Sequence, residues 1–390
     1  MISRPLKTIG RKINTVYGFR LYTYYLNEEF EDLLSKKAMR LSDEEITKYK
    51  SLDSETIMGH LLSVDMIDDF VYNFTKNFLS DCFIYNDFTE SMSNYLANIF
   101  KNNYEYLSCD YIKENVFYKE IDFRNLKDDN FSLKFDYFND FEFFKYGHPL
   151  LSSKYNFFIP HIGYFEEKCK YPVIINKNTE KIYEPITPYK IFESEAAIDK
   201  AFGNVLVIGC NMGYFSYIIS NKINVNKITI VEPDKTLFTF FKEKILPQFN
   251  NKRKIKLINS DIFSYLEKVE DGEFNYCYID ILDDKSDSNT FFKIENAINK
   301  FKKTKVDCYF ENEFLLKVTN NVFVEILDAY LQRKNIANEN YTDLPRLVWQ
   351  SQSPIRNLLK NEEIQSAEDI NYFLDPSTIK YLIRKNKIIL

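Results

Sequence analysis

The stretch of sequence that decides the fold is Asn204–Phe215, NVLVIGCNMGYF. Its apolar run Val205–Ile208 is typical of a strand that is buried on both faces of a sheet. Two glycines, Gly209 and Gly213, follow, and a helical pattern begins at Tyr214. Such a tight turn offers backbone N–H groups to a ligand and needs residues that tolerate positive φ. The stretch predicts a strand, a turn and a helix, and the turn either binds a ligand or only connects the two elements.

Strands and helices alternate after this stretch. Further apolar runs predict strands at 228–231, 255–258, 276–279 and 306–310. Amphipathic patterns predict helices at 214–221, 235–246, 262–268 and 289–301. Alternation at this spacing requires crossover connections and a parallel sheet, so we expect a doubly wound α/β core.

Acidic side chains stand where these strands end. Glu232 closes the second strand and is followed by Pro233, while Asp261 and Asp280 come after the third and fourth strands. The carboxyl ends of parallel strands share one edge of the sheet, where ligands of open α/β folds bind. An acid at the position of Glu232 can accept both hydroxyls of a ribose. Simpler roles remain open, namely a solvated carboxylate for Glu232 and a helix N-cap for Asp261.

The whole chain is expected to have four parts. They are a helical N-terminal region (1–114), a mixed strand and loop region (115–195), the alternating core (196–334) and a helical C-terminal extension (335–390). The first part has apolar residues three and four apart in 57–78, and a capping-box pattern at Ser42 and Glu45. The second has short aromatic runs broken by Asn, Asp, Gly and Pro. Helical patterns at 326–331 and 379–383 follow the last strand of the core.

Composition excludes several classes of protein. With 51 basic and 57 acidic residues the net charge is −6, so a dedicated nucleic-acid binder is not expected. Six cysteines stand singly and only three histidines are present, which argues against a zinc site or a disulfide framework. No segment is apolar enough to span a membrane or to act as a signal peptide. We expect a cytoplasmic protein without a metal.

Four segments together resemble a known family. In order, they are 205–213, 230–234, 260–263 and 278–280, and they resemble the motif series of class I S-adenosylmethionine-dependent methyltransferases, which have a Rossmann-like core. The resemblance covers about Ala196 to Asn312, and it extends loosely to uncharacterised bacterial methyltransferase-like proteins. It implies S-adenosyl-L-methionine as the cofactor.

The resemblance also implies a role for particular residues. Those expected to bind the cofactor are Gly209, Cys210, Asn211, Gly213, Tyr214, Phe215, Glu232, Pro233, Asp261, Ile262 and Asp280. In this family Glu232 would hold the ribose hydroxyls, Asp261 the adenine amino group and Ile262 one face of the ring. Asp280 would lie near the methyl sulfonium. Apart from the resemblance, Asp280, Asp283 or Asp284 could act as a general base, with Asp280 and Asp283 as the main candidates.

Three functions remain open. The main expectation is methyl transfer to a small or medium-sized acceptor, whose pocket is formed by the loop Asp280–Asp284, by Thr187–Ile191 and by elements of the N-terminal half. The family pattern has a glycine at Asn211 and an acid at Val207, so a non-catalytic scaffold built on such a core is one alternative. The other is an aminopropyltransferase of the spermidine-synthase type, which resembles the core but has an Asp at the position of Met212. The sequence indicates neither the acceptor nor the oligomeric state.

Overall fold

The computed structural model describes residues 27, 29–82, 90–126, 128–152, 157–180, 182–183, 185–281, 288–309 and 375–386, with scattered residues between 311 and 373. The chain forms two compact units. Unit 1 comprises Met1–Lys113 and Asp136–Tyr171, and unit 2 comprises Glu114–Phe135 and Pro172–Leu390. The division into units falls within two strands, β2 (Phe131–Phe138) and β5 (Cys169–Asn176).

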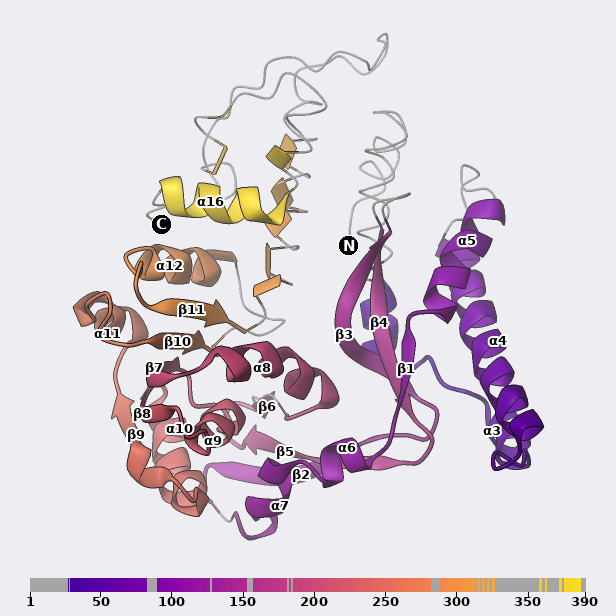
Figure 1. Ribbon diagram of the computed structural model, residues 1–390, viewed down its shortest axis with the longest axis horizontal. Helices are drawn as coiled ribbons and strands as arrows, with labels where there is room; N and C mark the ends of the chain where they lie inside the picture. The colour runs from indigo at the N-terminus through magenta and orange to yellow at the C-terminus, as the bar shows by residue number, and fades with distance from the viewer. Residues whose placement is uncertain are drawn as a thin grey trace. The chain divides into compact units, whose positions relative to one another are not determined.

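Unit 2 is built around a five-stranded parallel sheet (Figure 1). Its strands are β7 (Gly203–Ile208), β8 (Val225–Glu232), β9 (Ile255–Asn259), β10 (Tyr276–Ile279) and β11 (Lys305–Cys308). They lie in the order β11-β10-β7-β8-β9, so the apolar strand of the deciding stretch is central. All four pairings are parallel, with Val207 opposite Ile230 on one side and Tyr278 on the other. The doubly wound α/β core is confirmed.

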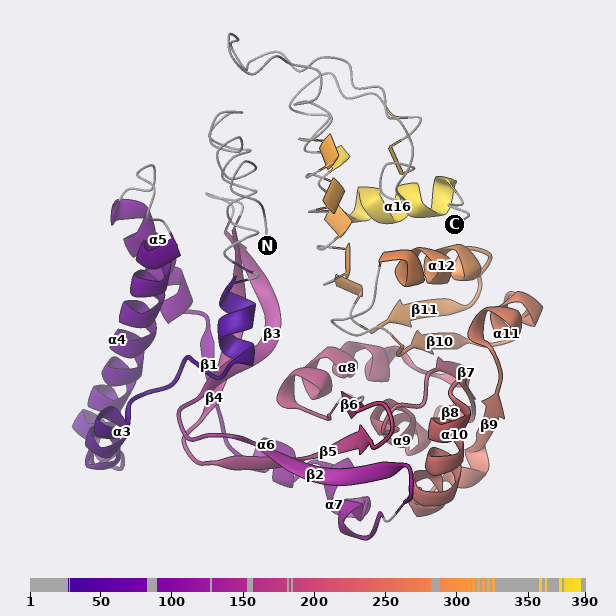
Figure 2. The same ribbon diagram turned by 180° about the vertical axis from the view of Figure 1, so that it is seen from behind.

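Helices follow each of the first four strands. They are α9 (Tyr214–Ser220), α10 (Lys235–Phe240), α11 (Ile262–Lys268) and α12 (Ser288–Ile298). The chain moves outward from β7 to β9 and then returns to β10 and β11. Because crossovers are right-handed, this reversal places α9 and α10 on one face and α11 and α12 on the other. Figures 1 and 2 show the sheet with its helices from two opposite sides.

The reversal of direction creates a switch point between β7 and β10. Ligands of open α/β sheets bind in the crevice outside the carboxyl ends of the strands at such a point. In this chain Gly209 follows β7 and Asp280 follows β10 at this switch point. The fold therefore brings the first turn and the fourth acidic residue to the same place.

Other parts of unit 2 cover the core. Helix α8 (Pro188–Lys200) begins at the N-cap Thr187, whose side chain accepts a hydrogen bond from Lys190 N, and contacts α9. Helix α7 (Val116–Glu120) also contacts α9, and its Phe117 packs edge-on against Tyr214. The C-terminal helix α16 (Pro376–Asn386) contacts α12.

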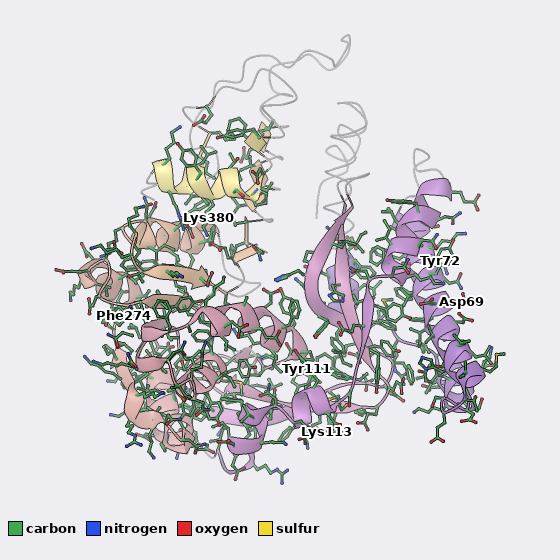
Figure 3. The ribbon with its side chains drawn as sticks, in the orientation of Figure 1. Asp69, Tyr72, Tyr111, Lys113, Phe274 and Lys380 are labelled. Carbon is green, nitrogen blue, oxygen red and sulfur yellow. The ribbon has the colours of Figure 1, made fainter. Side chains whose placement is uncertain are left out.

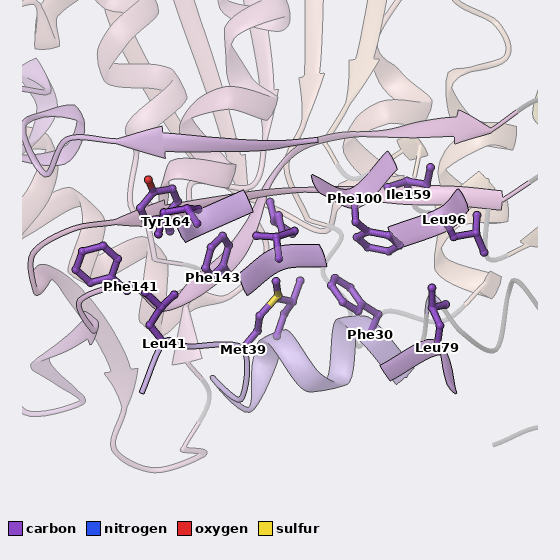
Figure 4. Packing of buried hydrophobic residues seen from close by; sticks show 14 of the residues in the cluster. Phe30, Met39, Leu41, Leu79, Leu96, Phe100, Phe141, Phe143, Ile159 and Tyr164 are labelled. Carbon is purple, nitrogen blue, oxygen red and sulfur yellow. The ribbon is translucent and has the colours of Figure 1, made fainter. Parts of the chain in front are cut away.

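Unit 1 consists of helices and a three-stranded sheet. Its main helices are α3 (Asp43–Lys50), α4 (Ile57–Cys82) and α5 (Glu90–Lys101), with the short α6 (Asp110–Lys113). The sheet has the order β1-β4-β3, formed by β1 (Tyr104–Leu107), β4 (Phe157–Phe165) and β3 (Phe143–Ser152). Figure 4 shows the buried apolar cluster between these elements, in which Phe30, Phe100 and Phe143 are fully buried.

A third sheet has the order β2-β5-β6, with β6 at Ile182–Tyr183. The expected strands and loops between residues 115 and 175 are thus present, and the strands β3 and β4 are ten and nine residues long.

The structure differs from the expected elements in two places. Strand β1 lies in a region that the sequence predicts to be helical, and it pairs with the distant β4. The helix after β8 continues beyond α10 as a π-helix at Phe241–Ile245. The predicted helix at 326–331 lies almost wholly outside the described residues, whereas α16 confirms the helix at 379–383.

The four-part division of the chain stays a prediction. In the part of the chain that the structure describes, no helix is long and apolar enough to cross a lipid bilayer.

Candidate functional site

The turn after β7 has an unusual backbone. Gly209, Asn211 and Gly213 all have positive φ, at 90°, 39° and 83°. A Cβ on Gly209 would lie 2.4 Å from the carbonyl oxygen of Asp280, so only glycine fits where the turn passes the end of β10. Asparagine tolerates the left-handed region better than most residues, and the Asn211 side chain donates to the same Asp280 carbonyl at 2.8 Å. Asn211 therefore replaces a glycine without breaking the turn.

The second glycine has a packing role. A Cβ on Gly213 would approach Phe241 Cε2 to 2.6 Å, and Phe241 is fully buried in the π-helix. Tyr214 and Phe215, next along the chain, are also buried, and Phe215 stacks on Tyr278 with ring centroids 3.8 Å apart. This side of the turn is sealed by the core, and contact of these two rings with a cofactor stays a prediction.

Glu232 joins the first turn to the second strand. One carboxylate oxygen accepts from Cys210 N and the other from Asp234 N, both at 2.9 Å. The residue is 4% exposed, and burial raises the pKa of its carboxyl while the two N–H donors act in the opposite direction. The carboxylate is therefore held rigidly at the end of β8, beside the turn.

Neighbouring side chains support this position. Asn259, at the end of β9, donates to the carbonyl of Glu232 at 2.8 Å and to that of Pro233 at 3.2 Å. Asp234 caps α10 by accepting from Thr236 N, and it also accepts from the Tyr183 hydroxyl at 3.1 Å. Hydrogen bonds from β9, α10 and β6 thus hold the chain in place after β8.

Asp261 caps a helix. Its carboxylate accepts from Ser264 N at 2.8 Å at the start of α11, and this contact helps to lower the pKa of the exposed side chain. The capping role that the sequence left open is therefore present. Ile262 is buried in the first turn of α11, and the expected contacts of both residues with an adenine stay predictions.

Asp280 takes part in a buried ion pair. Its Oδ1 lies 2.6 Å from Lys190 Nζ, and the two side chains are 7% and 4% exposed. The same ammonium lies 3.2 Å from the centroid of the Tyr309 ring, which is 2% exposed. Asp280 N also donates to the carbonyl of Ile208 at 2.8 Å, so this group lies at the switch point. The second candidate base, Asp283, lies outside the described residues.

The sequence does not predict the contacts of Lys190 and Tyr309, although Lys190 lies in the segment Thr187–Ile191 that is expected near the acceptor. A signal for Lys190 is present, because it shares the spacing of the buried positions Ser194 and Ala197 on α8. A lysine on the buried face of a helix needs a partner, and an acid at a strand end is a natural one. Tyr309 follows β11 directly, and nothing in the local sequence indicates its contact.

More charged pairs lie between α12, α16 and the chain after β11. Arg384 Nε is 2.7 Å from Glu295 Oε2, and Glu295 is fully buried. Lys380, labelled on α16 in Figure 3, pairs with Glu311. Among the described residues, no three His, Cys, Asp or Glu side chains gather closely enough to hold a metal ion.

Comparison with known proteins gives one family match. Residues 190–326 match the family model of the Spermine/spermidine synthase domain, which is less than half of the chain. The match includes the first turn, Glu232, and the pair Lys190 and Asp280. No curated protein matches the chain.

Several solved structures resemble the chain weakly. The methyltransferase domain of bacterial CtHen1 is 16% identical over 30% of this chain and 59% of that one, with a TM-score of 0.25. Mitomycin 7-O-methyltransferase MmcR is 14% identical over 30% and 34%, with a TM-score of 0.24. Spermidine synthase from Thermotoga maritima is 15% identical over 39% and 59%, with a TM-score of 0.28. This chain thus spans less than two thirds of each of these proteins, and similarities this weak carry no weight for function.

The strand order and the family match agree on the class of protein. The core belongs to the Rossmann-like superfamily of S-adenosylmethionine-dependent methyltransferases and related transferases.

Proposed function

We propose that unit 2 is a transferase that moves an aminopropyl group from a decarboxylated S-adenosylmethionine to a small amine. The observation that carries this proposal is the family match over 190–326, which spans the whole site at the switch point. The match favours the aminopropyl alternative over the methyl transfer that was the main expectation from the sequence. Both reactions use an adenosyl sulfonium donor, so the donor-binding residues are the same in either case.

The described residues fit such a donor. Glu232 is a preorganised acceptor, because two backbone N–H groups fix its carboxylate and leave further lone pairs for ribose hydroxyls. The Gly209–Gly213 turn would lie against the sugar and the sulfonium chain, and Ile262 against the adenine. Asp280 would lie near the reactive carbon.

The transfer itself requires little from the protein beyond alignment. The nitrogen lone pair of the acceptor forms a bond to the carbon attached to sulfur, and the carbon–sulfur bond breaks with its electron pair remaining on sulfur. The sulfonium becomes a neutral thioether, and the new ammonium loses one proton. A nearby carboxylate such as Asp280 can orient the amine and accept this proton. Asp283 stays a prediction for the same role.

Methyl transfer is kept as the second candidate because of Lys190. Its ammonium neutralises Asp280, so this carboxylate offers no unpaired charge to the cationic tail of an aminopropyl donor. An intact S-adenosylmethionine carries a carboxylate in that tail, and a neighbouring cation favours it.

The products distinguish the two reactions. The protein is incubated with decarboxylated S-adenosylmethionine or with S-adenosylmethionine and a panel of small amines. We expect methylthioadenosine from the first donor, whereas S-adenosylhomocysteine from the second would support methyl transfer instead. Glu232→Gln should reduce turnover, and Glu243→Gln, the same change at an exposed position after α10, should not. Absence of both products with both donors would reject a transferase.

A further inference from the structure

The group around Lys190 has the composition of a binding site for an organic cation. A carboxylate oxygen of Asp280 lies 2.6 Å from the ammonium, and the ring of Tyr309 lies 3.2 Å from it. A carboxylate and an aromatic face are the two groups with which proteins bind ammonium ions, and both act most strongly when water is excluded. All three residues are buried. Both groups of a cation-binding site are thus present, and the Lys190 ammonium is the cation that they hold.

Lys190 is built into this position. The N-cap Thr187 accepts from Lys190 N, and the Lys190 carbonyl accepts from the Ser194 hydroxyl at 2.7 Å. The residue lies in the first turn of α8 on the face that the helix buries. Its ammonium is therefore a fixed part of the site rather than a surface group that folds over it.

The position adjoins the first turn. The Asp280 carbonyl accepts from Asn211 Nδ2, and Gly209 is packed against the same carbonyl. A donor bound along this turn would present its reactive carbon close to Asp280. An acceptor amine must reach that carbon, so the charge beside Asp280 acts directly on the choice of acceptor.

Two further described carboxylates of this region already have cations. Glu311 pairs with Lys380, and Glu295 pairs with Arg384. These two carboxylates therefore offer no unpaired charge to a second ammonium.

We propose that Lys190 occupies the cation position formed by Asp280 and Tyr309, so that the acceptor of this site carries one amine and no second ammonium. This inference rests on the proposed function, because it concerns the acceptor of the same site. It predicts that a diamine, whose far ammonium would compete with Lys190, is discriminated against in favour of a monoamine of the same length.

The test compares two probes of equal length, 1-aminobutane and 1,4-diaminobutane. Each is titrated into the full chain by calorimetry, with and without saturating methylthioadenosine. We expect the wild type to bind the monoamine at least tenfold more tightly than the diamine. Equal or tighter binding of the diamine by the wild type would overturn the inference, and this comparison needs no variant to fold.

Variants then assign the effect to Lys190. Lys190→Met should raise affinity for the diamine at least tenfold, because it exposes the Asp280 carboxylate and the Tyr309 face. Lys200→Met, at the end of the same helix in a more exposed pair with Asp307, should change neither affinity. Adding Asp280→Asn to Lys190→Met removes both charges and should abolish the gain. A diamine affinity that Lys190→Met leaves unchanged would count against the inference.

The two proposals fail separately. If methylthioadenosine does not bind the wild type, the proposed function fails, whereas the amine preference is still measured without it. If methylthioadenosine binds and the diamine is preferred, the proposed function stands and the role of Lys190 is rejected.

Discussion

We expect the carboxylate of Glu232 to make donor binding depend on pH. Burial disfavours its charged form, so its pKa lies above the ordinary value of 4.5. In the proposed complex the ionised form accepts hydrogen bonds from the ribose hydroxyls, and the protonated form accepts fewer. We expect affinity for methylthioadenosine to fall as the pH is lowered through this raised pKa, by about 1.5–3 kcal/mol in full. Calorimetry at a series of pH values measures the effect.

The Gln variant serves as the reference for this prediction. In Glu232→Gln the affinity should be weak and independent of pH over the same range, since the titrating group is gone. The free energy of unfolding depends on pH in the opposite direction. The folded state holds the Glu232 proton more tightly than the unfolded chain does, so the contribution of Glu232 to stability falls as the pH rises from 4.5 through the raised pKa. A wild-type affinity that does not change with pH would show that Glu232 does not contact the ligand.

At the scale of single residues, the sequence predicts groups whose position follows from the backbone. Glu232 and Gly209 lie at the carboxyl ends of buried strands. In a parallel sheet the backbone alone places such residues at one edge, independently of side-chain contacts. Lys190 was missed because a lysine is rarely fully buried, and its partner is 90 residues away. Only the finished fold shows that the two meet.

A buried ion pair joins the end of helix α16 to α12. Glu295 on α12 is fully buried, burial raises the pKa of its carboxyl, and Arg384 lies 2.7 Å from it. Arg384→Met would remove the cation that binds this carboxylate directly and leave only the Coulombic influence of Lys380. We expect a loss of about 3 kcal/mol in the free energy of unfolding, the lower end for a broken buried pair, because the Arg384 side chain is 38% exposed. Denaturant unfolding at neutral pH measures it.

A neighbouring pair provides the control. Lys385 binds Glu362 on the surface, so Lys385→Met should change stability by about 1 kcal/mol or less. The effect of Arg384→Met should also shrink as pH falls through the raised pKa of Glu295, since the protonated carboxyl needs no cation. Equal effects of the two substitutions would contradict the role of the buried pair.

Helix α4 has two unlike halves. The sequence pattern places Ile57, Leu61 and Leu62 with the buried face, yet they are 84%, 52% and 46% exposed, whereas Leu79 is fully buried in the unit 1 core. Leu79→Ala should therefore destabilise the protein by about 2–5 kcal/mol. Leu61→Ala should change stability by about 0.5 kcal/mol or less. Thermal unfolding of the two variants measures the difference, and similar losses would mean that the first half of α4 is covered.

At the scale of elements, local patterns predict best those that are buried on both faces. The strands β7 and β10 contain continuous apolar runs that are fully buried, and α11 has the predicted bounds. Strand β1 is four residues long and is defined by pairing with β4, more than fifty residues away. Strand propensity depends on such neighbours, so the sequence around β1 does not reveal it.

Over the whole molecule, both units are discontinuous in sequence. Unit 2 takes up Glu114–Phe135 before the chain returns to unit 1 at Asp136. Changes in local pattern follow the order of the chain and do not reveal such a return. Aromatic packing connects residues 114–135 to the rest of unit 2. The ring centroids of Phe131 and Phe240, for example, lie 4.5 Å apart.

Every described residue of the candidate site belongs to unit 2, so a donor analogue should stabilise that unit selectively. At a methylthioadenosine concentration of a hundred times its Kd, the bound state is stabilised by about 2.7 kcal/mol. Amide exchange that proceeds through opening of unit 2 should then slow in β7 and β8, whose ends carry the first turn and Glu232. Exchange in β3 and β4 should not change, because unit 1 can open without disturbing the site. Hydrogen–deuterium exchange followed by mass spectrometry measures the exchange rates of both units in one sample. In the control variant Glu232→Gln, methylthioadenosine should no longer slow exchange in β7 and β8. Slowing of β3 and β4 to the same extent as β7 and β8 would show that the two units open together and that the site is not a property of unit 2 alone.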